Sequence, residues 1–361
     1  MWQRNYLSGN VLDEQIIYWK NKLNDFQTIN LPQDKIRPDI FDYKGNNVYF
    51  SFEEKVTNDL KRIAKELGVS LYSLMLGGFY LMLSSYSNQK DVIIGSPIAN
   101  RHYSGCENII GFFVNTVALR QRIDINDDIF SFIKTVHNTV IEAQLHQDLP
   151  FEKIVNEFQL EKDTSRNPLF QILFGIQDFE YRKLFDNPAS LFDSCDEIVD
   201  TNIITAKFDL SVYISPNSSN IEGVFNYASS IFNKSTICGY IDTYKNIICQ
   251  LAELEVSKII TISEIKLNSE SCSKQLLYDW NQTYSPYPKD KTAIELFEEQ
   301  VWRTPDNVAT TFEGTSLTYS QVNEEANRFG HYIKDHFNIN PDDMIVLCLE
   351  RSHHMLIAIL G

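Results

Sequence analysis

The sequence predicts an α/β protein in which helices pack against a mixed β-sheet. Short apolar runs typical of strands recur along the chain, at 48–53, 91–98 and 169–176. Helical segments lie between them, and one of these, 71–84, is apolar on nearly every side. A helix of that kind is expected to be buried beneath other elements. Strands that alternate with helices indicate a sheet layer covered by helices.

Composition sets the broad class of the protein. With 361 residues, 43% of them hydrophobic, the chain has enough apolar material for a large core and more than one domain. A formal net charge of −16 argues against nucleic acid or an anionic membrane as a partner. The sequence has no apolar run of membrane-spanning length and no secretory signal at its start. We therefore expect a cytoplasmic protein without nucleic-acid or membrane partners.

Two helices follow the first predicted strand. The first spans 57–67 and ends at Gly68, because glycine readily adopts the left-handed conformation that closes a helix. The second, 71–84, begins after Ser70, whose hydroxyl is a suitable cap. Its central pair, Gly77-Gly78, lowers helix propensity by about 1 kcal/mol per residue relative to alanine. We expect that pair to mark close packing against another backbone.

The remaining elements follow from the same patterns. Gly111 lies in a segment where a strand would need a bulge or a close neighbour. The other predicted elements are a helix over 11–23, a helix over 130–143, a hairpin formed by 207–215 and 221–228, and a helix over 233–254.

The stretch from 146 to 171 has the most unusual local chemistry. His146, Gln147 and Asp148 stand before Pro150, and Asp148 is expected to cap a helix over 151–158. The run Ser165-Arg166-Asn167-Pro168 then predicts a polar turn before the strand at 169–176. His146 suggests an acid or base, but no Gly-x-Ser-x-Gly elbow or activated cysteine accompanies it. A hydrogen-bonded structural pair with the neighbouring carboxylate is the other interpretation.

Three segments carry a family resemblance. In order, they are IGFFVNT at 110–116, HQDLPFE at 146–152 and SRNPLFQ at 165–171. They resemble the later motifs of the condensation domain of nonribosomal peptide synthetases. The opening segment, WQRNYLSGNVLDEQ, resembles the passage from the first to the second lobe of that domain. The resemblance implies that residues 1–265 form a second lobe with the chloramphenicol-acetyltransferase-like fold.

The end of the chain resembles a different domain. The segment LYDWNQTYSPYPKDKTAIELFEEQVWRTPDNVA resembles the junction between a condensation and an adenylation domain, and LTYSQV and ERSHHMLIAILG resemble early adenylation segments. We expect a linker at 266–291 and a truncated start of an adenylation domain at 292–361. A helix is expected around Phe297 and Val301, and the next is capped by Thr318 or Ser320. ATP and Mg would serve only a complete adenylation domain, because its phosphate loop is absent here.

The resemblance implies an activity and its partners. Condensation joins a carrier-bound acyl or peptidyl thioester to the amine of a carrier-bound amino acid, with both held on the phosphopantetheine arms of peptidyl carrier domains. The family's acid/base motif, His-His-x-x-x-Asp-Gly, does not occur, and His353-His354 is followed by MLIAILG. We therefore expect no catalytic residue, bound cofactor or metal in this chain. It would depend on a missing first lobe and on the remainder of the adenylation domain.

The candidate site residues can have either a structural role or a role in the tunnel. Asn115 either pairs with backbone or, by the resemblance, faces the tunnel. The other tunnel or structural motif residues are His146, Gln147, Asp148, Ser165, Arg166 and Asn167. Among these, we hypothesise that His146, Asp148 and Arg166 hold the bridge between lobes.

Three alternatives remain beside this hypothesis. In the first, the motif segments are simply a helix cap and a turn. In the second, the chain is a non-catalytic remnant that docks carrier or synthetase domains. In the third, the family's epimerising or cyclising relatives are the better match. The segment HQDLPFE and the start of an adenylation domain that follows argue against this alternative.

Overall fold

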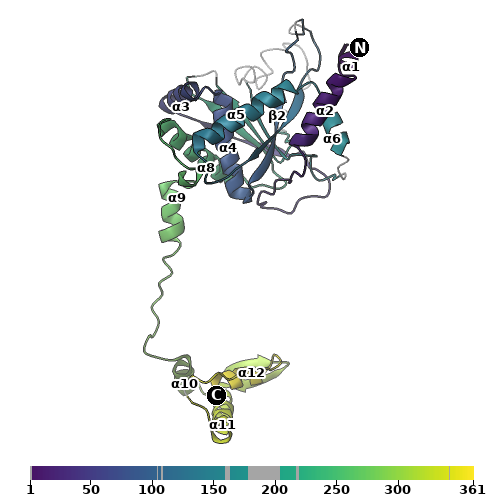
Figure 1. Ribbon diagram of the computed structural model, residues 1–361. Helices are drawn as coiled ribbons and strands as arrows, with labels where there is room; N and C mark the ends of the chain where they lie inside the picture. Colours follow the sequence, from purple (N-terminus) through teal and green to yellow (C-terminus); the bar gives the residue numbers. More distant parts are fainter. Residues whose placement is uncertain are drawn as a thin grey trace, which may run out of the picture. The chain divides into compact units, whose positions relative to one another are not determined.

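The chain folds into two compact units, Met1–Asp279 and Trp280–Gly361. The computed structural model describes residues 2–103, 105–106, 109–158, 163–177, 204–216, 219–340 and 342–361. Figure 1 traces the chain from the N-terminal helices to the C-terminal unit. Among the described residues, no single helix is both long and apolar enough to cross a bilayer.

A six-stranded mixed sheet forms the centre of the first unit. Its strand order is β1-β6-β5-β4-β2-β3, and the pairs β2/β4 and β4/β5 are parallel while the others are antiparallel. The predicted strands and hairpin are confirmed, whereas β3 was not predicted. The strands are β1 (Gly45–Ser51), β2 (Asp91–Ile98), β3 (Asn115–Arg122), β4 (Ile172–Ile176), β5 (Leu210–Ser215) and β6 (Glu222–Ala228).

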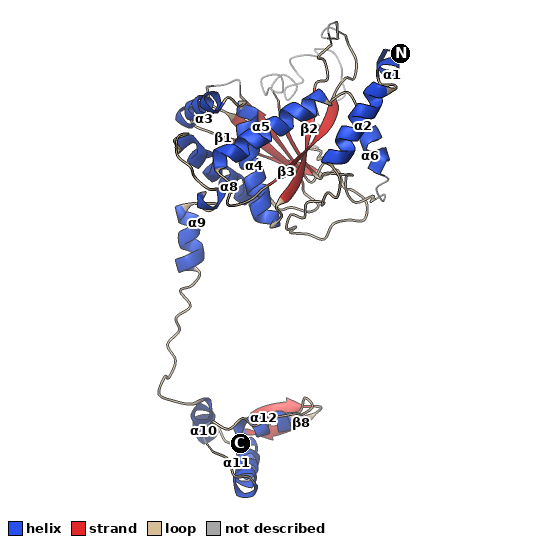
Figure 2. Ribbon diagram, in the orientation of Figure 1, coloured by secondary structure: helices blue, strands red, loops and turns tan. Residues whose placement is uncertain are grey.

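Helices cover this sheet in the first unit. Figure 2 shows α3, α4, α5 and α8 gathered over the strands, and α2 with α6 beside β3. The apolar residues of α4 are buried there, as its sequence predicted. The helices are α1 (Trp2–Tyr6), α2 (Asn10–Lys22), α3 (Glu54–Leu67), α4 (Leu71–Ser87), α5 (Ile129–Leu145), α6 (Phe151–Phe158) and α8 (Lys234–Glu253).

The ends of α3 and α4 follow their sequence signals. Gly68 closes α3 with φ of 70°, and the Ser70 hydroxyl accepts a hydrogen bond from the backbone N–H of Ser73 at the start of α4. The expectation for the glycine pair was right about close packing and wrong about the partner. A Cβ atom on Gly78 would lie 2.5 Å from the Cδ1 atom of Ile248, so a side chain of α8 fills the space rather than a backbone.

One glycine of the sheet accommodates an aromatic ring. A Cβ atom on Gly95 in β2 would lie 2.1 Å from the Phe170 ring, and Phe170 is 1% exposed. Phe170 precedes β4, which pairs with β2 through Gly95 and Leu173. The absent side chain therefore lets the segment before β4 pack directly on β2.

The segment after residue 265 is partly helical. The helix α9 (Glu270–Lys274) continues into a π-helical turn, η3 (Gln275–Asp279), and both belong to the first unit. Residues 282–292 contain no helix or strand. The segment expected as a linker, 266–291, therefore contains helical turns in its first half.

The second unit is small and has its own apolar cluster of Val322, Ala326 and Ile357. Glu313 and Gly314, both with positive φ, form the two-residue turn of its hairpin. Its elements are α10 (Ala293–Arg303), β7 (Val308–Phe312), β8 (Thr315–Thr318), α11 (Tyr319–His336) and α12 (His353–Leu360).

The structure shows which of the two predicted residues, Thr318 or Ser320, caps α11. Thr318 accepts a hydrogen bond from the backbone N–H of Gln321, whose side chain accepts one in return from the backbone N–H of Thr318. This reciprocal pair is a capping box. Thr318 is therefore the cap, and Ser320 lies inside the helix.

Candidate functional site

Asn115, at the start of β3, fastens the loop between α5 and α6. Its Nδ2 atom donates to the carbonyls of Gln147 and Leu149, each at 2.8 Å. Its Oδ1 atom accepts from the backbone N–H groups of Thr116 and Phe151 at 2.9 and 3.1 Å. An asparagine amide has two donor hydrogens and two acceptor lone pairs, and here all are used. Asn115 thus pairs with backbone, one of the two interpretations of its sequence.

The start of α6 corrects the predicted cap. Because Asn115 accepts the N–H of Phe151, the first-turn donor of this helix is satisfied by a residue from β3. The carbonyl of Pro150 accepts from Lys153 and Ile154, so the helical bonds begin at that proline. The Asp148 carboxylate takes part in none of these contacts. Its predicted role as a helix cap was wrong, because its oxygens bind side chains instead.

Asp148 joins three segments that lie far apart in the sequence. Its Oδ2 atom accepts hydrogen bonds from the hydroxyls of Tyr103 at 3.0 Å and Tyr6 at 3.4 Å. Its Oδ1 atom lies 3.3 Å from Nε2 of His102. Only 11% of the Asp148 side chain is exposed. The carboxylate therefore connects α1, the loop after β2 and the loop before α6.

Tyr103 remains a hydrogen-bond donor to this carboxylate. Burial, and after it the hydrogen bonds with Tyr6 and Asp148, raise the pKa of Tyr103 well above its usual range. The ring of Tyr6 packs edge-on against that of Tyr103, with centroids 5.5 Å apart. A phenol that keeps its proton continues to donate to the carboxylate at every physiological pH.

Arg101 organises the loop that follows β2. Its guanidinium donates to the carbonyls of Cys106, Ile109 and Gly111, at 2.9 Å for Ile109 and 3.3 Å for Gly111, and lies 4.3 Å from the centre of the Phe113 ring. Gly111 lies in this loop and not in a strand, so the expected strand was wrong there, but a close neighbour is present, because a Cβ atom on Gly111 would lie 3.2 Å from the Phe113 ring. The chain enters the sheet only at residue 115.

His146 follows the last residue of α5 and packs against α2. Its ring stacks on Tyr18 with centroids 3.7 Å apart, and its Nδ1 atom lies 2.8 Å from the carbonyl of Glu142. Its own carbonyl accepts from the indole of Trp19 at 3.0 Å. The proposed structural pair of His146 with Asp148 is wrong, because His102 is the imidazole beside that carboxylate. His146 instead joins α2 to the end of α5.

The second group of predicted residues forms a turn before β4. Asp163 accepts from the backbone and hydroxyl of Ser165 at 2.8 and 2.6 Å, and its other oxygen lies 2.9 Å from Arg166. These contacts hold the pKa of Asp163 below its usual value. Asn167 donates to the carbonyl of Lys207 at 2.7 Å. Among the described residues, no polar contact connects this turn with His146 or Asp148, so the structure does not bring the three bridge candidates together.

A cavity of about 380 Å³ lies beside the first group. Its wall includes Asn100, Tyr103, Phe113, Asn115, Asp148 and Glu152. Sequence reasoning selects Asn115 and Asp148 and misses Arg101, His102 and Tyr103. Their signal was a polar run directly after a buried strand, which is a common place for functional side chains. The wall of this cavity therefore offers hydrogen-bonding groups and a concave surface to a ligand.

Two family models match this chain. The model described as "Condensation domain" matches residues 1–277, and the model described as "AMP-binding enzyme" matches residues 297–361. This chain belongs to the condensation-domain family. Its condensation part is followed by the start of an AMP-binding domain.

Relatives of this condensation chain are peptide synthetases. It is 35% identical over 362 residues to surfactin synthase subunit 1 of Bacillus subtilis (strain 168), and 33% identical over 362 residues to gramicidin S synthase 2 of Aneurinibacillus migulanus. It is 33% identical over 361 residues to bacitracin synthase 2 of Bacillus licheniformis. All of this chain aligns, but it spans only 10%, 8% and 14% of these relatives.

Solved structures confirm the predicted fold class. A four-domain nonribosomal peptide synthetase, bound to AMP and glycine, matches with a TM-score of 0.73 and 20% identity over 92% of this chain and 26% of that one. The X-domain from teicoplanin biosynthesis matches with a TM-score of 0.62 and 21% identity over 73% of this chain and 60% of that one. At such identities the likeness concerns the fold, which is the mixed α/β fold of condensation chains.

Proposed function

We propose that this chain forms one lobe of a condensation domain in a nonribosomal peptide synthetase module. The reaction joins a carrier-bound acyl or peptidyl thioester to the amine of a carrier-bound amino acid. The observation that carries the proposal is the meeting of two motif segments at one cavity. Asn115 of IGFFVNT binds the backbone of HQDLPFE, beside a cavity of about 380 Å³.

The chemistry is acyl transfer. The amine nitrogen attacks the thioester carbonyl, a C–N bond forms, the C–S bond breaks, and the amine proton leaves while the carrier thiol departs. Holding two tethered reactants in line supplies much of the acceleration in such a reaction. The residues of this chain would shape and position, and the acid/base histidine would come from a motif that these 361 residues do not contain. Phosphopantetheine arms of peptidyl carrier domains would deliver both substrates.

Asn115 and Asp148 are proposed as positioning residues. The Asn115 amide has no hydrogen-bonding capacity left for a substrate, so it would act by fixing the loop from 147 to 151. Asp148 would fix the loop after β2 through His102 and Tyr103. The turn at Ser165, Arg166 and Asn167 would keep the segment before β4 in place, and His146 would join α2 to α5.

The test uses an intact module whose two carriers are loaded with thioesters. We expect Asn115→Ala to lower the condensation rate by at least about tenfold, because misplacing reactants by an ångström has effects of that size or more. Thioester loading of both carriers should not change. Asn126→Ala is the control, since within the described part of the chain its exposed side chain hydrogen-bonds only to Asp124 on the loop after β3. Condensation at the normal rate with Asn115→Ala would overturn the positioning role.

The size of the native polypeptide tests whether these residues act as part of a larger synthetase. Relatives are many times longer than the chain, so we propose that these residues act within a large synthetase that supplies the other lobe and a complete adenylation domain using ATP and Mg. An antibody against residues 1–265 should detect a band far above 41.8 kDa. A band at 41.8 kDa that binds carriers without turnover would instead support a docking module.

A further inference from the structure

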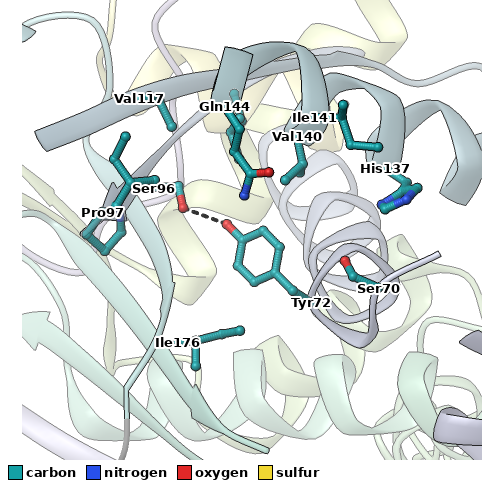
Figure 3. A pocket seen from close by; sticks show the side chains of 12 residues that line it. Ser70, Tyr72, Ser96, Pro97, Val117, His137, Val140, Ile141, Gln144 and Ile176 are labelled. Carbon is teal, nitrogen blue, oxygen red and sulfur yellow. Dashed lines mark hydrogen bonds between the residues drawn. The ribbon is translucent and has the colours of Figure 1, made fainter. Parts of the chain in front are cut away.

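A second cavity, of about 290 Å³, lies between the sheet and α5 in the first unit (Figure 3). Its inner wall includes Val117 and Leu119 of β3, which are 2% and 1% exposed. Its rim includes Ile141 of α5 and Ile176 of β4, which are 42% and 52% exposed. Buried apolar walls with an accessible rim are typical of small-molecule sites.

Polar groups also line the cavity: Ser70, His137 and Gln144 lie on its wall, and a hydrogen-bonded polar pair lies deeper. Tyr72 reaches from α4 toward Ser96 on β2, and the two side-chain oxygens lie 2.7 Å apart (Figure 3). The Tyr72 hydroxyl also donates to the carbonyl of Phe174 at 3.3 Å. Ser96 therefore donates its own proton to Tyr72. Its oxygen then keeps acceptor capacity, because in the described part of the chain Tyr72 is the one hydrogen-bond partner of that hydroxyl.

The polar pair is part of the buried structure. Ser96 is 5% exposed, so its oxygen is shielded from bulk solvent. Burial raises the pKa of the Tyr72 phenol and outweighs the opposite effect of Ser96. The phenol thus remains protonated and keeps its hydrogen bond to the carbonyl of Phe174. A ligand hydroxyl that donates to Ser96 would make a hydrogen bond in a low-dielectric setting.

The size of the cavity favours a substituted ring. An apolar cavity of about 150 Å³ can hold benzene, so this one has room for a ring and a polar substituent. The Tyr72 ring forms part of the wall, and aromatic pairs add attraction beyond apolar burial. The cavity also borders the candidate site, because Ile98 in its lining is the cross-strand partner of Asn115.

We propose that this cavity binds an aromatic ring that carries a hydroxyl group, with the hydroxyl donating to Ser96. We assign the ring to the side chain of a carrier-bound substrate, and this assignment rests on the proposed function. The position next to Asn115 would let a substrate place its side chain here while its reacting end lies in the larger cavity.

Calorimetric titration of the full chain with p-cresol and toluene tests this proposal, since the two probes differ only in the hydroxyl. We expect p-cresol to bind roughly three- to tenfold more tightly, which is the usual net contribution of one hydrogen bond. Ser96→Ala should remove the preference and leave toluene binding in place. Ile141→Trp should weaken both probes by about tenfold or more by filling the mouth.

The control for the tryptophan is Ile17→Trp on α2, where the native side chain is 58% exposed and outside the cavity lining. Equal affinity of the two probes, no binding at millimolar concentration, or unchanged binding with Ile141→Trp would each overturn the proposal. Condensation is not measured in this titration. A negative titration therefore overturns only the proposal that this cavity binds the ring. Failure of the thioester assay would overturn the positioning role of Asn115 and would not affect the ring-binding proposal.

Discussion

Arg120 and Asp91 form a two-point ion pair across the β2/β3 ladder. The Arg120 Nε atom lies 2.8 Å from Oδ1 of Asp91, and Nη2 lies 2.5 Å from Oδ2. Only 7% of the arginine and 19% of the aspartate side chain are exposed. The same guanidinium donates to the carbonyls of Lys22, Asn24 and Asp25. The pair thereby fastens the segment after α2 to the edge of the sheet.

Removing the aspartate charge should destabilise the first unit. We expect Asp91→Asn to lower the free energy of unfolding by roughly 2–4 kcal/mol, because it leaves a buried guanidinium without its counter-charge. Urea titration followed by circular dichroism measures the change. Arg122→Gln is the control, since Arg122 also approaches Asp91 but is 79% exposed and should contribute less than about 1 kcal/mol. Equal losses in the two variants would refute this account.

Two helical glycines should respond to alanine with opposite sign. In α4, Gly78→Ala would place a methyl group 2.5 Å from the Cδ1 atom of Ile248, and overpacking of this kind costs about 1–3 kcal/mol. In α8, the one described atom within 4 Å of a Cβ on Gly239 is the Tyr86 hydroxyl oxygen, at 4.0 Å, so Gly239→Ala should stabilise by up to about 1 kcal/mol. Hydrogen exchange of the amides of each helix distinguishes the two. Stabilisation by Gly78→Ala would show that the Ile248 side chain moves away from the added methyl group without loss of stability.

The cap of α5 should make stability depend on pH. Burial works to raise the pKa of Asp128, but hydrogen bonds from the backbone of Ser131 and Ile260 outweigh it and hold the pKa below the ordinary value. The folded protein thus binds this proton less readily than the unfolded chain. The stabilisation is present above the unfolded pKa and is lost as pH falls through the folded pKa.

Asp128→Asn tests this dependence. Asparagine keeps one acceptor oxygen for Ser131 but places an NH2 donor opposite the backbone N–H of Ile260, so at pH 7 the variant should be less stable than the parent by about 1–3 kcal/mol. Between pH 5 and pH 3, its free energy of unfolding should fall less steeply than that of the parent, as measured by urea titration at each pH. Parallel slopes for the two proteins would show that Asp128 does not contribute.

The second unit offers a matched pair of cap variants. Thr318→Ala removes the acceptor for the Gln321 amide, so we expect the first turn of α11 to lose about 1 kcal/mol. That loss corresponds to roughly fivefold faster exchange of the Gln321 amide hydrogen. Ser320→Ala keeps the backbone bond of residue 320 to Pro305 and should leave that rate nearly unchanged. Faster exchange in both variants would argue against a cap-specific effect.

Local signals account for what the sequence predicted well. Helix caps such as Ser70, helix stops such as Gly68, and apolar runs such as 91–98 depend on neighbours in sequence, so they can be recognised without the fold. The strand β3 escaped prediction because Arg120 and Gln121 interrupt its apolar pattern. Both are buried, Arg120 through its pairing with Asp91 and Gln121 through a hydrogen bond from Thr139.

The candidate site shows the limit of local reasoning. The motif segments point to Asn115 and Asp148, but the partners of Asp148 come from residues 6, 102 and 103. No local pattern relates those positions, since the fold alone brings them together. The cap predicted for Asp148 failed for the same reason, because an asparagine from β3 occupies that role.

The strand order affects how the chain reaches its fold during synthesis. The sheet begins with β1, which pairs with β6 and with no other strand of the described residues, and Ser51 pairs with Glu222. At about 5–20 residues per second, the ribosome takes roughly ten to thirty seconds to make the intervening chain. Throughout that interval β1 exposes unpaired backbone and the aromatic side chain of Phe50, which is 8% exposed once folded. We therefore expect a nascent chain of this topology to benefit from chaperones, and slow translation between residues 51 and 222 to increase its aggregation.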